Sequence, residues 1–291
     1  MEEKQQIQIG GNVDKAVKGE YVITPRDVLS EAWQLTNANR LSINLGLIFV
    51  FFLGLAIVFI SSQYFGGLES ALANPEAMVA LNLLVTIAIY PFIAGVEMMG
   101  VLHAVGIKTR PRLVFSFLRR GSWVALCAVM TSMFISLGLQ LFIIPGIFIA
   151  VLLSLTIPLV VEKQLSPAKA IVLSIKALRF QMFNIFFVYL ALFMGLIVAA
   201  MPFALFGGNG SGGGDILAMA IFFFLMSYLA PLYFNAKGVL YRDIFGMQLQ
   251  AVKSDFNDNS DNSSGGNSGG SQGNGNSKGT GNDSDNDIFI A

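Results

Sequence analysis

The sequence predicts an all-α membrane protein with six transmembrane helices, and two observations carry this prediction. Hydrophobic residues make up 54% of the 291 residues and charged residues only 12%, whereas soluble domains carry about 25% charged residues. The stretch 121–161 holds no charged residue, and as a single helix it would measure about 60 Å, twice the thickness of a bilayer's hydrocarbon core. We therefore expect it to cross twice, turning near Pro145-Gly146, where proline removes a backbone donor and glycine permits a reversal.

Six apolar segments are the predicted spans; polar stretches separate them, except that the third and fourth are divided by Pro145-Gly146. They cover residues 43–62, 78–102, 122–144, 147–161, 184–206 and 216–236. The chain accordingly divides into a polar N-terminal segment 1–23, a membrane domain 24–245 and a tail 246–291. The tail is rich in Gly, Asn, Ser and Asp, a composition that predicts a flexible, disordered segment.

The distribution of charge predicts the orientation. All eighteen Lys and Arg residues lie in segments that six spans place on one side of the membrane. The loops on the other side hold no Lys or Arg, only Glu69, Glu76 and Asp215. Because basic residues are concentrated in cytoplasmic loops, we expect a protein of the plasma membrane with both termini in the cytoplasm.

The spans are expected to form three hairpins that share one plan. Each unit begins with a hydroxyl-bearing residue and a proline, at Thr24-Pro25, Thr109-Arg110-Pro111 and Ser166-Pro167, and continues as a short amphipathic cytoplasmic helix before the two spans. The alternative is chance similarity, because prolines are common within membrane helices and charges at their ends. The expected hinges or kinks are Pro91, Pro145, Gly146, Pro158 and Pro231.

Three ionisable residues near the cytoplasmic ends of the returning spans are candidates for function. Glu97 follows Pro91 by six positions, and Lys237 follows Pro231 by the same distance. Related units would place these two residues equivalently, so that they could pair across the bundle. The alternative is that both side chains extend into the headgroup region, where a charge costs little. Glu162 directly follows the fourth span, and its simplest interpretation is a charged residue at the boundary between the membrane and the cytoplasm.

Two further groups of residues suggest contacts with lipid and between helices. The densest basic cluster is expected to set the topology and to bind anionic headgroups, at about 1 kcal/mol per charge. It consists of Lys108, Arg110, Arg112, Arg119 and Arg120. In the fifth span, small residues recur every four positions, which allows another helix to approach closely. They are Ala191, Gly195 and Ala199.

No pattern predicts catalysis, a metal site, a cofactor or a nucleic-acid partner. His103 is the only histidine and Cys127 the only cysteine, so neither a cluster of metal ligands nor a general acid–base pair is indicated. After the polar tail, the apolar residues Ile288, Phe289 and Ile290 predict a docking peptide for a protein partner or a protease. A chance ending is the alternative.

Three segments carry a resemblance to a known family: 144–147 (IPGI), 155–162 (LTIPLVVE) and 166–176 (SPAKAIVLSIK). They resemble the YciC-like family of bacterial inner-membrane proteins and are similar to the membrane domain of some glycerophosphodiester phosphodiesterases. The likeness spans roughly residues 24–245. It implies a six-span fold in the bacterial inner membrane, with no established activity and no catalytic residues to transfer.

Two classes of function follow from these observations. The first is a non-enzymatic scaffold or regulator of envelope or lipid homeostasis. The second is a small-solute transporter or channel with a vestibule near Glu97 and Lys237. The spans carry scattered Asn, Gln, Ser and Thr residues and no acid or base at mid-membrane, which favours the first class. An enzyme is the least favoured class.

Overall fold

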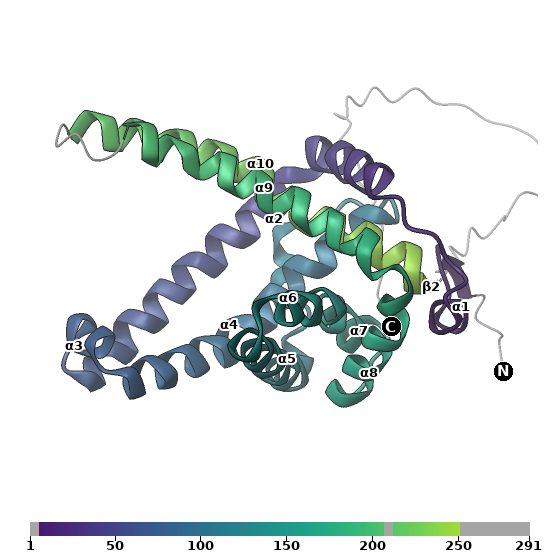
Figure 1. Ribbon diagram of the computed structural model, residues 1–291, viewed down its shortest axis with the longest axis horizontal. Coiled ribbons are helices and arrows are strands. Elements are labelled where there is room, and N and C mark those ends of the chain that lie inside the picture. Colours follow the sequence, from purple (N-terminus) through teal and green to yellow (C-terminus); the bar gives the residue numbers. More distant parts are fainter. Residues whose placement is uncertain (1–5, 207–211, 251–291) are drawn as a thin grey trace, which may run out of the picture. The chain divides into compact units, whose positions relative to one another are not determined.

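The computed structural model describes residues 6–206 and 212–250, and helices dominate this part of the chain (Figure 1). Residues Gln8–Met247 form one compact unit, which is described here by itself. Two short strands, β1 (Gln6–Ile9) and β2 (Met247–Gln250), pair as a two-stranded sheet. The predicted disorder of the tail beyond residue 250, and the predicted docking peptide Ile288, Phe289 and Ile290, lie outside the described residues.

The helices differ widely in length. The long ones are α2 (Pro25–Ser62), α4 (Pro75–Ala104), α5 (Gly121–Leu141), α9 (Met182–Phe206) and α10 (Gly212–Phe245). The shorter ones are α1 (Val13–Lys18), α3 (Leu68–Ala73), α6 (Ile143–Leu152), α7 (Thr156–Glu162) and α8 (Pro167–Leu178). Four 3-10 turns are also present: η1 (Gln63–Phe65), η2 (Pro111–Phe115), η3 (Leu118–Arg120) and η4 (Arg179–Gln181).

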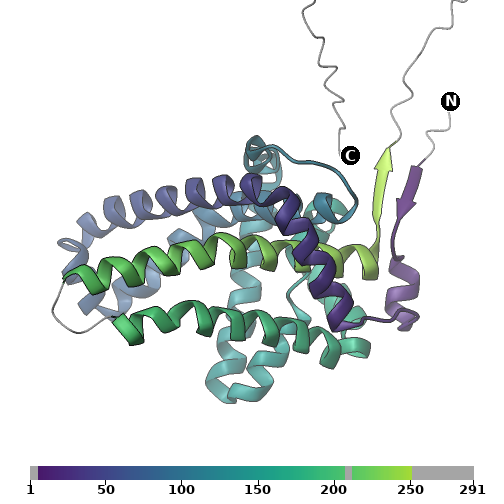
Figure 2. The same cartoon turned by 90° about the horizontal axis from the view of Figure 1, so that it is seen from above.

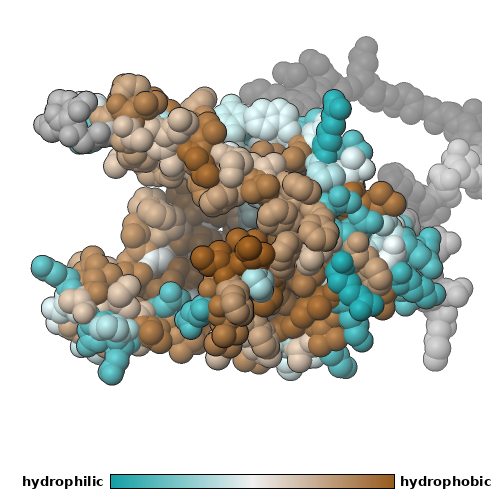
Figure 3. Space-filling model, in the orientation of Figure 1, coloured by the Kyte–Doolittle hydropathy of each residue, from teal (hydrophilic) through white to brown (hydrophobic). Residues whose placement is uncertain are grey.

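Six helical stretches of the described chain are long and apolar enough to cross a membrane, which confirms that part of the prediction. They are Pro25–Phe65, Pro75–Ala104, Pro111–Leu141, Ile143–Glu162, Pro167–Phe206 and Gly213–Phe245. Large apolar side chains are exposed along them, among them Phe52 (64%), Leu141 (73%) and Phe223 (60%). Figure 3 shows apolar side chains over most of the visible face, with hydrophilic ones gathered near α1 and α8 and near α3. A surface of this kind is suited to lipid rather than to water.

The short helices expected before each hairpin are only partly present. The helix expected at 24–33 is not separate from the first span, because α2 runs unbroken from Pro25 to Ser62. The polar residues 34–42 contain neither glycine nor proline to end it. The second expected helix is replaced by the 3-10 turns η2 and η3. This loop packs directly on α4, since a Cβ atom added to Gly95 would lie 2.6 Å from the Cα atom of Val114.

The turn expected near Pro145-Gly146 in the long uncharged run lies at Phe142, three residues before Pro145. Phe142 has an extended backbone (φ −153°, ψ 131°) between α5 and α6. Pro145 instead occupies the first turn of α6, where its missing N–H costs no hydrogen bond. Gly146 serves close packing, because a Cβ atom on it would lie 2.5 Å from the backbone nitrogen of Leu139 on α5.

The predicted fourth span is interrupted rather than kinked at its proline. Residues 153–155 separate α6 from α7, and Pro158 lies in the first turn of α7. The carbonyl oxygen of Leu152 at this break accepts a hydrogen bond of 2.6 Å from Ser174 Oγ on α8. Pro91 and Pro231 lie inside the continuous helices α4 and α10.

Pro231 illustrates how a membrane helix tolerates proline. Proline provides no N–H, so the carbonyl four residues earlier, that of Ser227, loses its helical partner. Asn44 Nδ2 on α2 donates a hydrogen bond of 2.9 Å to this oxygen. Side chains of neighbouring helices commonly satisfy backbone groups that proline frees in a membrane, and this bond ties α2 to α10.

Helices α2, α4 and α10 contact one another, α5 packs on α4, and α9 packs on α10. In Figure 2 the green helices α9 and α10 run side by side, whereas the teal α5 and α6 run across their direction. Gly195 faces α10, since a Cβ atom on it would lie 2.9 Å from Leu229 Cδ1. Of the other two small residues in that stripe, Ala199 is buried and Ala191 is exposed.

Candidate functional site

The structure brings Glu97 and Lys237 together inside the protein. Glu97 Oε1 on α4 and Lys237 Nζ on α10 are 2.5 Å apart, and the two side chains are only 5% and 6% exposed. Neither side chain extends toward the surface. The two residues that each follow a proline by six positions in the sequence therefore form a buried ion pair. This pair is the first feature of the candidate site.

Two glycines bring the backbones that carry this pair unusually close. A Cβ atom on Gly238 would lie 2.1 Å from the carbonyl oxygen of Gly100, and one on Gly100 would lie 2.1 Å from that of Phe234. Because both obstructing atoms are backbone, no side-chain rotation would make room. Helices α4 and α10 thus cross in backbone contact within one turn of Glu97 and beside Lys237. The sequence signal, a glycine shortly after each charge, was not used in the prediction.

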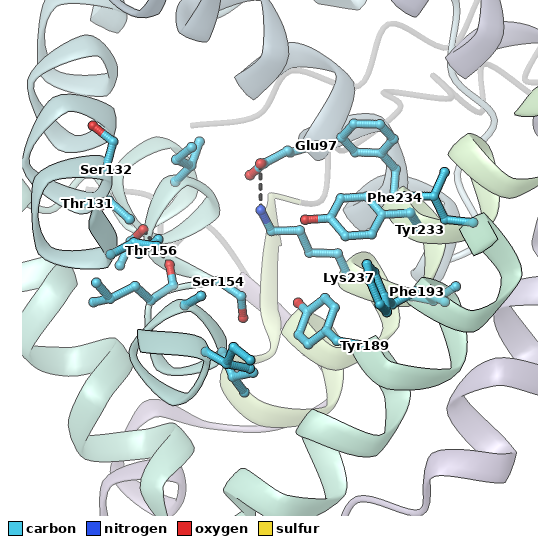
Figure 4. A pocket seen from close by; sticks show the side chains of 18 of the residues that line it. Glu97, Thr131, Ser132, Ser154, Thr156, Tyr189, Phe193, Tyr233, Phe234 and Lys237 are labelled. Carbon is cyan, nitrogen blue, oxygen red and sulfur yellow. Dashed lines mark hydrogen bonds and ion pairs between the residues drawn. The ribbon is translucent and has the colours of Figure 1, made fainter. Parts of the chain in front are cut away.

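The ion pair lies at the wall of a cavity of about 900 Å³. Its walls come from α4, α5, α6, α7, α9 and α10 and are mainly apolar, including Ile135, Leu139 and Leu196. Figure 4 shows the hydroxyl groups of Tyr189 and Tyr233 on the same side of the cavity as Lys237, with Thr131, Ser132 and Thr156 across from them. Cavities of 300–1,000 Å³ with apolar walls and a few polar groups are typical of sites for small molecules.

Glu97 Oε2 at this cavity is buried and has no hydrogen-bond partner within the described ranges, whereas the buried hydroxyl groups of Tyr189 and Ser154 lie close enough to interact with each other. Leaving a buried polar group unsatisfied costs about 1–3 kcal/mol, and native proteins leave few such groups. The Glu97 carboxylate at the cavity wall thus retains one acceptor position that a further donor could fill.

The break between α6 and α7 also lies at the cavity. Leu153, Ser154 and Thr156 line it, and here the backbone leaves helical geometry. Irregular backbone at membrane depth is tolerated where protein buries it or where it lines a cavity, and discontinuous helices form many membrane binding sites. The interruption therefore contributes polar atoms to the side of the cavity opposite α10.

Glu162 does not belong to this site. Its Oε2 accepts a hydrogen bond of 2.7 Å from the Tyr241 hydroxyl on α10, and its Oε1 lies 3.1 Å from Lys163 Nζ. Glu162 is buried but does not line the cavity. It thus connects the end of α7 to α10, a structural role.

The predicted basic cluster lies on the loop between α4 and α5, away from the lining of the cavity. Lys108, Arg110, Arg112 and Arg119 are exposed. Arg120 is half-buried and donates a hydrogen bond of 2.7 Å to Gln164 Oε1. The apolar side chains of Phe115 and Leu118 are exposed between these cations. This combination is suited to a bilayer's interfacial region.

A buried polar network around His103 was not predicted. His103 Nδ1 lies 2.9 Å from Asn235 Oδ1, and Asn235 Nδ2 donates a hydrogen bond of 2.9 Å to Thr36 Oγ1. His103 Nε2 lies 2.8 Å from Thr109 Oγ1. The network links α2, α4, α10 and the following loop, and isolated polar residues in a sequence give no signal for such a cluster.

A second unpredicted cluster holds the C-terminal end of α10. Arg242 forms a bidentate pair with Glu31 on α2, and it also donates a hydrogen bond of 2.8 Å to the carbonyl oxygen of Ala104. The backbone N–H of Gly11 donates a hydrogen bond of 2.8 Å to the carbonyl oxygen of Arg242. A Cβ atom on Gly10 would lie 2.2 Å from that same oxygen. Only glycine therefore fits where the N-terminal segment contacts α10.

The N-terminal segment is also fixed to α8. The Tyr21 hydroxyl donates a hydrogen bond of 2.7 Å to the carbonyl oxygen of Ala177, and Gln181 Nε2 donates one of 3.3 Å to the carbonyl oxygen of Tyr21. Burial raises the pKa of Tyr21 to about 12, so its hydroxyl remains a donor at neutral pH.

In the part of the chain that the structure describes, no three His, Cys, Asp or Glu residues group in a way that could hold a metal ion. Comparison of the chain with protein-family models, curated proteins and solved structures finds no match. The resemblance to the YciC-like family therefore stays a prediction, and the functional proposal depends on the geometry of the cavity.

Proposed function

We propose that this chain is a non-enzymatic, multi-pass protein of the bacterial inner membrane that binds a membrane lipid in the cavity between its helices. In this role it acts as a regulator or scaffold in lipid or envelope homeostasis. One observation carries the proposal: an otherwise apolar cavity of about 900 Å³ contains a buried ion pair whose carboxylate retains an oxygen without a partner among the described residues.

In the proposed topology, α2 with α4, α5 with α6, and α9 with α10 are three membrane hairpins. Contacts between the members of each pair support this arrangement, and the one-sided distribution of Lys and Arg supports cytoplasmic termini. The expected third surface helix corresponds to α8. Its amphipathic character is supported by the burial of Ala170, Ile171 and Ser174 and the exposure of Lys169 and Lys176. The exposed basic cluster between α4 and α5 then faces the anionic inner surface of the membrane.

In this topology the charged end of the cavity lies toward the cytoplasm and its apolar end toward the membrane interior. The headgroup and acyl chains of a lipid in the inner leaflet are arranged in the same way. Glu97 and Lys237 lie toward the cytoplasmic ends of α4 and α10, whereas Leu139 lies near the outer end of α5, beside the turn at Phe142. A lipid can place its headgroup at the ion pair and its acyl chain against the apolar walls. Phe193 at the edge of the cavity is 54% exposed, so the cavity adjoins the surface that contacts lipid.

A purely structural role explains the ion pair less well. Removing two charges from water costs several kcal/mol per ion, and apolar residues of similar volume often stabilise a protein as well or better. Ionisable residues inside membranes are accordingly rare and usually functional. The partner-free oxygen of Glu97 adds a further cost that a bound headgroup would remove.

The proposal predicts that filling the cavity removes bound lipid. Ala150 and Ala230 line the cavity from α6 and α10, and we expect A150W/A230W to retain much less lipid than the roughly one molecule per chain of the wild-type protein. The measurement is lipid extraction and mass spectrometry of protein purified in mild detergent. The matched control is A80W/A200W, which adds the same two indoles at exposed positions outside the cavity. Equal lipid retention by both double variants would refute the proposal.

The same cavity supports a second candidate, a small-solute transporter with its vestibule at Glu97 and Lys237. The hydroxyl groups facing the ion pair are the specific observation in its favour. The apolar walls favour lipid over a hydrated solute. Solute uptake into proteoliposomes that is lost in Glu97→Gln would select this second function.

A further inference from the structure

We infer that the bound lipid is a zwitterionic phospholipid with a protonated amine that carries N–H groups, such as a phosphoethanolamine headgroup. Its ammonium group would bind Glu97 Oε2 and its phosphate Lys237 Nζ. This inference rests on the proposed function and specifies the class of lipid.

Glu97 requires a donor from the ligand. Its Oε1 is occupied by Lys237 Nζ at 2.5 Å, while Oε2 has no partner among the described residues, and Glu97 is one of the residues that line the cavity. An ionised carboxylate can only accept hydrogen bonds. A ligand that completes this site must therefore present an N–H or O–H group to Oε2.

Lys237 and its neighbours require an acceptor. The ammonium group has three donors, and one of them is used in the hydrogen bond to Glu97 Oε1. The hydroxyl groups of Tyr189 and Ser154 line the same cavity and lie close enough to interact with each other, so one of the two retains a donor for the ligand. Lysine commonly binds phosphate as a point charge, and the remaining hydroxyl donor suits another phosphate oxygen.

The net charge of the site selects a neutral headgroup. Glu97 and Lys237 sum to zero, so an anionic lipid would leave an uncompensated charge in a poorly solvated cavity. A zwitterion instead places its positive group at the carboxylate and its negative group at the ammonium. Choline is excluded as the optimal headgroup for a different reason, because its quaternary nitrogen carries no N–H to donate to Oε2.

The test is a binding series on the delipidated wild-type protein, measured by native mass spectrometry. Four lipids with identical acyl chains carry a phosphoethanolamine head with no, one, two or three N-methyl groups, and phosphatidylglycerol is the anionic comparison. We expect similar affinities while one N–H remains, and about a tenfold loss at the third methyl group, as for a lost hydrogen bond to a charged group. Phosphatidylglycerol should bind at least as weakly as the trimethylated lipid.

In Glu97→Gln, the lipid with three N-methyl groups should bind about as tightly as the lipids that retain an N–H group. The reason is that this substitution removes the carboxylate charge to which the N–H group donates. Glu162→Gln is the matched control, since it makes the same change at a buried carboxylate outside the cavity and should leave the loss intact. The wild-type series decides the inference even if Glu97→Gln does not fold.

The outcomes separate the inference from the proposed function. Equal, tight binding of all five lipids, or tightest binding of phosphatidylglycerol, would overturn the headgroup assignment and leave lipid binding standing. Failure of the wild-type protein to bind any of the five would overturn the proposed function itself.

Discussion

Lys237→Met is expected to destabilise the protein by about 3–5 kcal/mol, because it leaves the buried Glu97 carboxylate without its counter-ion. Lys237 is the group that compensates this charge at 2.5 Å, and both side chains are almost fully buried. The measurement is the free energy of unfolding in mixed detergent and SDS micelles. Lys176→Met is the matched control, since Lys176 is exposed on α8, and should change stability by less than about 0.5 kcal/mol.

Removing both charges should restore much of that loss. E97Q/K237M leaves neither member of this pair as a buried ion, so the penalty that dominates the single variant disappears, and the two substitutions should be strongly non-additive. Equal stability of Lys237→Met and Lys176→Met would show that the pair is solvated rather than buried.

Gly238→Ala is expected to cost about 3 kcal/mol, at the upper end of typical overpacking. The added methyl group would lie 2.1 Å from the carbonyl oxygen of Gly100, so α4 and α10 must separate. The separation would also pull Lys237 away from Glu97, and lipid retention should fall with stability. Unfolding of the purified variant in mixed micelles measures the first effect, and lipid mass spectrometry measures the second.

Gly213→Ala provides the control for this prediction. It makes the same substitution on α10 at a position with no atom within 4 Å of the new methyl group. Alanine is favoured over glycine in a helix by up to about 1 kcal/mol, so this variant should be as stable as the wild-type protein or more stable. If Gly238→Ala behaves in the same way, the close crossing of α4 and α10 is incorrect.

Local properties of the sequence predicted the long helices well. Apolar length identified six stretches capable of spanning a membrane, because each contains enough consecutive apolar residues to override weak local signals. Pro25 and Pro167 correctly indicated the first residues of α2 and α8, since proline is preorganised for the first helical turn. The boundary between the expected surface helix and the first span was wrong, because a change in polarity does not by itself end a helix.

Features that depend on contacts between distant residues were not predictable in this way. The break at 153–155 follows no glycine or proline, and Ser174 on another helix satisfies the carbonyl of Leu152 there. Equal spacing from proline suggested that Glu97 and Lys237 could pair, but their burial depends on the backbone contact at Gly100 and Gly238. The cavity has no local signature, because it arises only where α5, α6, α9 and α10 come together around the pair.

Photocrosslinking from inside the cavity tests the central claim, selective lipid binding, most directly. Benzoyl-phenylalanine would replace Tyr189, whose side chain lines the cavity, or Phe187, which is 53% exposed and does not line it. After irradiation in native membranes, we expect position 189 to yield predominantly one class of lipid adduct by mass spectrometry, and position 187 to reflect the composition of the bulk membrane. Identical adduct distributions at the two positions would contradict a selective lipid site.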